Sequence, residues 1–397
     1  MRLGIVTSHP IQYQVPLFRA LAAQVDLTVY FAHKATGTNQ AEAGFDNSFD
    51  WDTDLTSGFR HVFLENVSKR PSITRFSGCD TPSIGEIIAR GNMDAVTVYG
   101  WHFKSYFQAA RACRNLGVPV MVRTDSHLMA PRSFLKRAAR AMVHPILLRQ
   151  FDLFLPTGTR SAQYLHRYGV PESRVHSVPY CIDTDTFGSV AKQGEAARER
   201  LRAQFGVAAH EAAILFVGKF VKLKEIPTLI EAVATLANAG MSLRLVLVGS
   251  GPLAGELVRF AEGRRLPVTF AGFVNQSRMP EVYAAADVVV LPSSSETWGL
   301  VVNEAFASGV PAIVSNQVGC GPDVILDGLT GTIVPVGDVR ALAKAIEYWV
   351  HGSTKPCDEV VQGALREMTM RYSPASSAAA FVAAAERAVA IGREGMH

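Results

Sequence analysis

Residues 291–311 read LPSSSETWGLVVNEAFASGVP, a serine-rich loop between two apolar stretches. The three valines and the leucine that lead into the loop are typical of a buried strand. Gly309 and Pro311 close the second apolar stretch, which predicts a helix that ends there. The helix should therefore begin near Gly299.

Two carboxylates, Glu296 and Glu304, flank this predicted helix start, roughly 7–9 Å apart at the helical rise. Between them, the amides of Gly299, Leu300 and Val301 have no intrahelical acceptor, and the helix dipole is positive there. Such a place suits a diphosphate. Because a carboxylate repels phosphate but accepts hydrogen bonds from hydroxyls, we expect Glu296 to hold a hexose and Glu304 a ribose. The expected ligand is a nucleotide diphosphate sugar.

The spacing of this glutamate pair resembles glycosyltransferase family 4. Six further blocks agree in the order of that family: residues 216–224, 245–253, 270–274, 283–288, 316–323 and 327–334. The resemblance implies an α/β protein of the GT-B fold, in which two Rossmann-like domains with parallel sheets face an interdomain cleft. It also implies a retaining enzyme that moves a hexose-type sugar from a UDP- or GDP-linked donor to a saccharide or lipid-linked saccharide. Surface polysaccharide or glycolipid biosynthesis is the expected setting.

Composition agrees with a two-domain globular protein. The 397 residues exceed what one core usually supports, and 48% are hydrophobic while 19% are charged. A net charge of +4 is too small to indicate nucleic acid binding. Five scattered cysteines without a Cys-x-x-Cys pair argue against a disulfide framework or a zinc site. No apolar run predicts a membrane span or signal peptide, so a cytoplasmic protein is expected, with the inner membrane face as an alternative.

Short apolar strands alternate with helical patterns in both halves, which predicts two parallel sheets covered by helices. We expect an acceptor-binding domain at 1–187, a donor-binding domain at 188–375 and a helix at 376–397 that packs back on the first domain, as the family implies. Residues 177–187 and the polar stretch after them are the expected linker.

In the second domain, Lys219 and Lys224 occupy positions where the family has cations that face the donor diphosphate. They would stabilise the charge that develops on the leaving group without a metal ion. Lys222 is expected to be solvent-exposed, although all three lysines could simply solvate a loop. The nucleobase is expected at a backbone edge formed by Gly272, Phe273 and Val274.

In the first domain, polar residues follow predicted strands. The family usually has a histidine after the strand at 118–123, and here either Asp125 or His127 can fill that role, by position or by residue type. His102 follows another strand and is a candidate acceptor contact or base. In place of the glycine pair that family members often have after the first strand, this chain offers His9, Gln12 and Tyr13 as side-chain contacts.

Two Asp-Thr-Asp sequences, at 52–54 and 183–185, are not expected to bind metal. The first lies in the segment 45–58, which we expect to form part of the acceptor wall, away from the donor domain. The helix at 131–149 carries Arg132, Lys136 and Arg140 on one stripe, so it is either a peripheral membrane helix or an ordinary surface helix.

Two alternatives to sugar transfer remain. A nucleotide-sugar epimerase can use the same two-domain arrangement. A non-catalytic sugar-nucleotide-binding protein is made conceivable by the unusual first loop.

Overall fold

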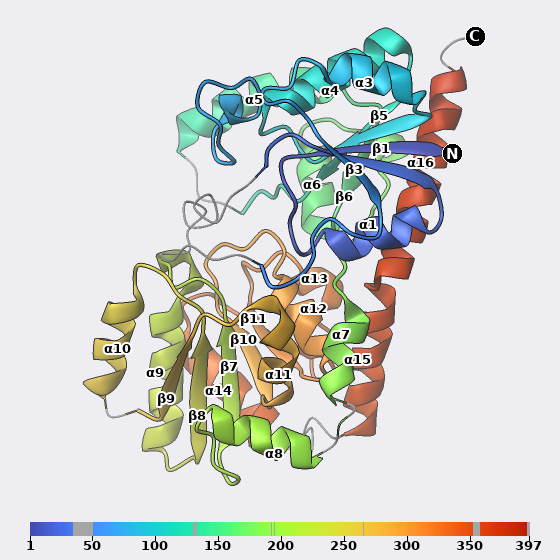
Figure 1. The fold of residues 1–397 in the computed structure, drawn as a ribbon. Coiled ribbons are helices and arrows are strands. Elements are labelled where there is room, and N and C mark those ends of the chain that lie inside the picture. The colour runs from blue at the N-terminus through green and yellow to red at the C-terminus, as the bar shows by residue number, and fades with distance from the viewer. Residues whose placement is uncertain are drawn as a thin grey trace.

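A computed structural model describes residues 1–34, 51–129, 133–191, 193, 195–264, 266–351 and 358–394. Two parallel sheets of six strands each, both flanked by helices, confirm the predicted α/β fold (Figure 1). The strands of the first sheet are Arg2–Thr7 (β1), Asp26–Phe31 (β2), Arg60–Phe63 (β3), Ala95–Val98 (β4), Val120–Thr124 (β5) and Leu153–Pro156 (β6). Those of the second are Ala212–Val217 (β7), Leu243–Val248 (β8), Val268–Gly272 (β9), Val288–Leu291 (β10), Ala312–Ser315 (β11) and Gly331–Val334 (β12).

The two sheets share one topology. Their strand orders are β3-β2-β1-β4-β5-β6 and β12-β11-β10-β7-β8-β9, so the strand order reverses between β1 and β4 in the first sheet, although all strands are parallel. The same reversal occurs beside β7 and β10 in the second. Ligands of open parallel sheets bind beyond the carboxyl ends of strands at such switch points. Ligand-binding residues are therefore expected in the loops after β1, β4, β7 and β10.

Helices fill the connections. In the first half they are Val15–Ala22 (α1), Ile84–Gly91 (α3), Lys104–Leu116 (α4), Phe134–Leu148 (α5) and Thr159–Arg167 (α6), with short 3-10 turns at Phe76–Gly78 and Glu172–Arg174. The second half has Thr184–Ala191 (α7), Glu195–Gln204 (α8), Ile226–Asn238 (α9), Ala254–Glu262 (α10), Met279–Ala284 (α11), Leu300–Ala307 (α12), Gly321–Val324 (α13), Val339–His351 (α14), Glu359–Arg371 (α15) and Pro374–Glu394 (α16), with 3-10 turns at Lys222–Lys224 and Gln276–Arg278.

The two C-terminal helices, α15 and α16, join the two halves (Figure 1). α15 packs against α12, and α16 crosses to α1, β4, β5 and β6 of the first sheet, where Phe381 is fully buried. The stretch Glu359–Gly392 is long and apolar enough by composition to span a membrane. Some of its apolar side chains lie in the cores of the two domains, with Leu365 buried in the second and Phe381 in the first.

Two features differ from the sequence expectation. Part of the expected linker is helical, since α7 spans Thr184–Ala191 and packs on α11 and α12 with Phe187 buried against Tyr283. The edge strand β3 was not predicted. Its residues RHVF do not alternate between buried and exposed side chains, and most of them are exposed. Within the described residues, β3 lies at the edge of the first sheet and pairs only with β2.

Candidate functional site

The loops after β7 and β10 meet through a lysine and a glutamate. Lys224 Nζ and Glu296 Oε2 form an ion pair in which the side chains are only 18% and 20% exposed. The backbone supports this contact, because the Ser294 amide donates to the Leu223 carbonyl over 2.8 Å. Two of the predicted donor-binding residues are thus held together at the switch point of the second sheet.

Lys219 lies beside this pair. Burial and the neighbouring Lys224 cation lower the pKa of Lys219, while Glu296 acts in the opposite direction. Two lysines that repel each other at a partly buried place favour the entry of a negatively charged group. The electrostatics of the loop therefore suit a diphosphate.

A close approach between backbones shapes this loop. Gly249 has a φ of +141°, and a Cβ there would lie 1.9 Å from the carbonyl oxygen of Gly218. No other residue fits, so the glycine after β8 lets the Lys219 loop pack directly against it. The glycine-rich turn thus shapes the cation-bearing loop.

The helix start was predicted within one residue. α12 begins at Leu300, and Gly299 is its N-cap with a φ of +104°. The first intrahelical bond runs from the Val302 amide to the Gly299 carbonyl over 3.0 Å, so the amides of Gly299, Leu300 and Val301 precede the helical ladder. The loop before them is braced, because the Gly319 amide donates a hydrogen bond to the backbone carbonyl of Glu296 over 3.0 Å.

Glu304 lies part-buried inside α12. The Tyr283 hydroxyl donates to Glu304 Oε2 over 2.5 Å, so a protein hydroxyl supplies the partner that the sequence led us to expect from a ribose. Burial raises the pKa of Glu304 to about 7, although the Tyr283 and Gln276 side chains oppose the shift. The carboxyl is thus poised to lose its proton near neutral pH, and hydroxyl donors from a ligand would favour that loss.

The expected base-reading edge follows β9. Gly272 is exposed with a φ of +70°, and its carbonyl already accepts from the Gly249 amide over 2.8 Å. Phe273 and Val274 are part-buried beyond it. A nucleobase at this edge would therefore use the backbone of those two residues rather than the Gly272 carbonyl.

In the first domain, Asp125 faces the segment that connects the two sheets. The Tyr180 hydroxyl donates to Asp125 Oδ2 over 3.1 Å, and the Arg123 guanidinium lies 5.2 Å from the centre of the Tyr180 ring. Burial, followed by the Asp125 charge, raises the pKa of Tyr180, so its hydroxyl stays protonated and donates. Tyr13 packs edge-on against Tyr180, with ring centroids 5.6 Å apart.

The other predicted first-domain residues interact with groups of the first domain. His127 is buried, and its Nδ1 accepts from the Met129 amide over 3.2 Å. His102 is exposed and stacks on Trp101 with ring centroids 6.4 Å apart. Burial and then His33 lower the pKa of His9 to about 4, so this imidazole is neutral at pH 7. Gln12 is part-buried in the turn that the Gln14 amide closes by donating to Ile11 over 2.9 Å.

A row of aromatic rings, absent from the sequence expectation, links these places. Tyr180 lies 5.9 Å from Trp298 between ring centroids, and Trp298 lies 5.8 Å from Tyr372. Trp298 is buried and donates from Nε1 to Asn303 Oδ1 over 2.8 Å. Because Trp298 is two residues after Glu296, the row connects Asp125 in one half with residues 292–299 in the other, which are the expected donor loop. Scattered single aromatics gave no sequence signal for this row.

The prediction that the segment 45–58 lies away from the donor domain was wrong for Asp52. Residues 45–50 lie outside the described residues, but Asp52 is not remote from the second domain. Its carboxylate accepts from the Ser277 amide over 3.2 Å and also from the Ser277 hydroxyl. Among the described residues, no group of three or more His, Cys, Asp or Glu side chains could hold a metal ion.

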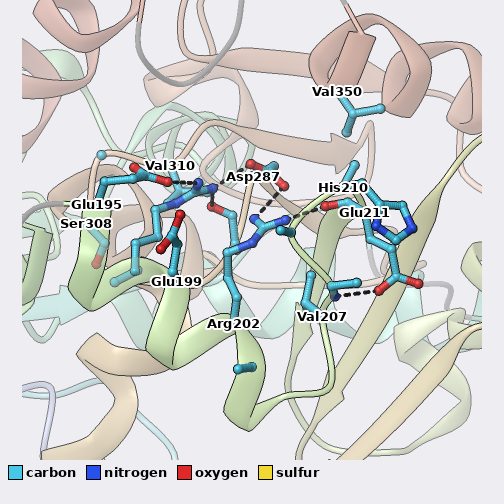
Figure 2. A pocket seen from close by; sticks show the side chains of 18 of the residues that line it. Glu195, Glu199, Arg202, Val207, His210, Glu211, Asp287, Ser308, Val310 and Val350 are labelled. Carbon is cyan, nitrogen blue, oxygen red and sulfur yellow. Dashed lines mark hydrogen bonds and ion pairs between the residues drawn. The ribbon is translucent and has the colours of Figure 1, made fainter.

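A separate surface cavity of about 940 Å³ lies at the amino ends of the second-sheet strands, and Figure 2 shows the side chains that line it. Arg198 and Arg202 enter it from α8, and both pair with Asp287, at 2.5 and 3.0 Å. The Asp287 carboxylate also accepts from the Ala213 amide over 2.6 Å. These charges satisfy one another and tie α8 to the sheet, so we assign this network a structural role.

The helix expected at 131–149 is α5, and its outward face is apolar. Phe134, Leu135, Met142, Val143 and Ile146 are between 55% and 79% exposed. Arg140 does not extend that face, because its guanidinium lies 5.9 Å from the centre of the Tyr164 ring. Arg132 and the side chains of Lys136 and Arg137 lie outside the described part of the chain. Of the predicted stripe, only Arg140 has a described side chain, and it lies half-buried against Tyr164.

Two family models match the chain. The model described as glycosyl transferases group 1 matches residues 197–365, and the glycosyl transferase 4-like domain matches residues 12–181. The first match spans the second sheet, and the second match spans the first sheet apart from β1. Together they include most of the residues discussed above.

Curated relatives agree. A D-inositol 3-phosphate glycosyltransferase from Xylanimonas cellulosilytica is 31% identical over 233 residues, which cover 57% of this chain and 55% of the relative. One from Mycobacterium tuberculosis is 30% identical over 240 residues, which cover 60% and 48%. The chain thus spans about half the length of the curated relatives it matches.

Solved structures share the whole fold. A glycosyltransferase from Rickettsia africae has a TM-score of 0.74 at 16% identity and covers 98% of both chains. HepE from Anabaena in complex with UDP has a TM-score of 0.74 at 17% identity, over 96% of this chain and 98% of that one. At such identities the likeness shows the GT-B fold.

Proposed function

We propose that this chain, which belongs to the glycosyl transferases of group 1 and has their GT-B fold, transfers a hexose-type sugar from a nucleotide diphosphate sugar. The acceptor is the hydroxyl of a saccharide or lipid-linked saccharide. Surface polysaccharide or glycolipid biosynthesis at the cytoplasmic side of the membrane is the setting that we propose. The structures of HepE with UDP and with UDP-glucose make a uridine diphosphate sugar the first donor to test.

One arrangement carries this proposal. Lys219, Lys224 and the amides at the start of α12 gather positive charge beside Glu296, and Glu304 lies further along the same helix. Cations and amides stabilise a leaving diphosphate, whereas carboxylates accept hydrogen bonds from sugar hydroxyls. The alternation of the two along one loop and helix suits a ligand with a diphosphate between two sugar rings.

We propose the following reaction for this site. The acceptor oxygen bonds to the anomeric carbon as the bond from that carbon to the diphosphate breaks. The acceptor proton passes to the leaving phosphate oxygen, so attack and departure occur on the same face and the configuration is retained. Charge on the leaving group is met by Lys219, Lys224 and the helix start, and no metal ion is required.

Asp125 is the residue that we propose near the reacting carbon. Its contact with Tyr180 places it at the junction of the two halves, whereas His127 accepts a hydrogen bond from the Met129 amide within its own turn. A carboxylate there can accept a hydrogen bond from the donor sugar or stabilise positive charge on the ring. His9, Gln12 and His102 are proposed acceptor or donor contacts from the neighbouring loops.

Incubation with and without acceptor tests the proposal. We expect thermal-shift screening against UDP, GDP and ADP sugars to identify a donor, and free nucleoside diphosphate to appear only when a saccharide acceptor is present. An epimerised nucleotide sugar formed from donor alone would favour the epimerase alternative. Tight donor binding without turnover on any member of an acceptor panel would favour a non-catalytic role.

We also propose that α5 contacts an anionic membrane surface. Its exposed apolar face is defined by Phe134, Leu135, Met142, Val143 and Ile146, and Arg149 at its end is exposed. Arg114 of α4 is also exposed and donates to the Arg149 carbonyl over 3.4 Å, which adds a second cation beside the helix. An apolar face with cations at its margin suits insertion among anionic headgroups.

Replacing Phe134, Leu135 and Met142 together with serine is expected to reduce binding to phosphatidylglycerol vesicles at least about tenfold, because each apolar side chain contributes roughly 1.5–3 kcal/mol when buried. Vesicle co-sedimentation measures the change. Val360→Ser with Met370→Ser is the matched control, since these residues are 66% and 74% exposed on α15. Equal loss in both variants, or a parent that dimerises instead of binding vesicles, would contradict the proposal.

A further inference from the structure

The first turn of α6 is capped by a residue from the other half of the molecule. Asp323 Oδ1 accepts from the Thr159 amide over 3.0 Å and from the Thr159 hydroxyl over 2.7 Å, and Oδ2 lies 3.2 Å from the same amide. A helix start is ordinarily capped by the side chain just before it. Here that residue is Gly158, so a carboxylate 164 positions away takes its place.

The two halves approach closely at this point. A Cβ on Gly158 would lie 2.5 Å from Trp298 Cζ3 and 2.9 Å from Asp323 Oδ2. Side chains do not approach a Cβ so closely, so any other residue at 158 would push α6 away from the donor loop. Arg160 adds a second link, because its Nη2 donates to the Asn316 carbonyl over 2.8 Å.

Asp323 is itself held where the chain passes between the domains. It lies on α13, and its carbonyl accepts from the Tyr372 hydroxyl over 3.1 Å. Tyr372 and Tyr180 mark the two segments that connect the sheets, and Trp298 packs between them. A contact beside both connections controls how the two sheets face each other.

We infer that Asp323 is a positioning residue for the transfer reaction. By capping α6 across the junction, it fixes the distance between a donor held in the second domain and Asp125 in the first. This inference rests on the proposed function, but it assigns Asp323 no contact with substrate. Small displacements of reacting groups lower rates steeply, so loss of this contact should act on turnover more than on donor binding.

Two variants test the contact from opposite sides. We expect Asp323→Ala and Gly158→Ala each to lower kcat on the order of 10- to 100-fold, because both separate α6 from the donor loop. The dissociation constant for UDP or GDP, whichever the parent binds, should change less than about twofold, since the proposed donor contacts lie in the second domain. Asp323→Glu, which keeps the carboxylate, should recover part of the rate.

Small-angle scattering of the full chain supplies a readout that does not depend on activity. Both variants should give a distance distribution different from that of the parent, with an unchanged melting temperature for the second-domain core. Parent-like scattering, a parent-like kcat, or a parallel loss of nucleotide affinity in Gly158→Ala would each overturn the inference. A parent that neither binds nucleotide nor transfers sugar would instead refute the proposed function, while the scattering would still decide the role of Asp323.

Discussion

Lys224→Ala is expected to lower kcat/KM for sugar transfer by about 100- to 1000-fold, the range for removing one preorganised charge-stabilising group. The reason is that Lys224 is one of two lysines beside the helix start, and negative charge grows on the diphosphate as the bond to the sugar breaks. The KM for donor should rise less than kcat falls, because the interaction strengthens in the transition state.

Lys222→Ala is the matched control for this prediction. Lys222 lies in the same 3-10 turn, but it is exposed, so its removal should leave kcat/KM within about twofold. Lys224→Arg preserves the charge and tests whether loss of activity in the alanine variant arises only from an unpaired Glu296. A fully active Lys224→Ala, or an equal effect of Lys222→Ala, would contradict the assignment.

Glu304→Gln is expected to stabilise the ligand-free protein at pH 8 while it weakens donor binding. The pKa of Glu304 is about 7 in the folded protein against an ordinary value of 4.5. Between these values the folded state binds more protons than the unfolded state, so the free energy of unfolding falls as the pH rises. The full contribution is about 3 kcal/mol; it is lost progressively as the pH rises from about 4.5 and is nearly gone above pH 7.

Glutamine cannot ionise, so the variant should avoid this loss. Chemical denaturation should show Glu304→Gln more stable than the parent at pH 8 by up to about 3 kcal/mol, with a much smaller difference at pH 5. Calorimetric titration with the donor nucleotide should show roughly 10- to 100-fold weaker binding, because a charge-assisted hydrogen bond to ribose is lost. In the parent, donor binding should weaken as the pH falls below 7.

Glu256→Gln on α10 removes an exposed carboxylate and provides the control. It should neither stabilise the protein at pH 8 nor change nucleotide binding. If Glu304→Gln unfolded like the parent at both pH values and bound nucleotide equally well, Glu304 would have neither role.

Much of the fold was readable from local patterns. The apolar runs that became β1, β2, β4, β5 and β6 were predicted because parallel strands are buried on both faces and read as continuous apolar segments. Short-range signals also placed the start of α12 at Gly299 within one residue, since a glycine and the apolar period that follows it lie in one stretch. β3 was not predicted, because an exposed edge strand has neither a continuous apolar run nor a helix-start signal.

The local sequence likewise predicted some features of the candidate site and left others to the tertiary structure. Local sequence could indicate that Glu304 needs a hydroxyl partner, but not that Tyr283 supplies one in the ligand-free protein. It placed Asp125 and His127 on equal terms, and only the packing of Tyr180 distinguishes their surroundings. It placed Arg140 on one stripe with Arg132 and Lys136, but it could not show that the Arg140 guanidinium lies over the Tyr164 ring.

The sequence alone therefore determined the two parallel sheets and the start of α12, because strand burial and helix capping act over a few neighbouring positions. The tertiary structure alone decided that Asp323 caps α6 and that Trp298 packs between Tyr180 and Tyr372. Those contacts join residues far apart in the chain, and their free energy arises only when two separately folded sheets are brought together.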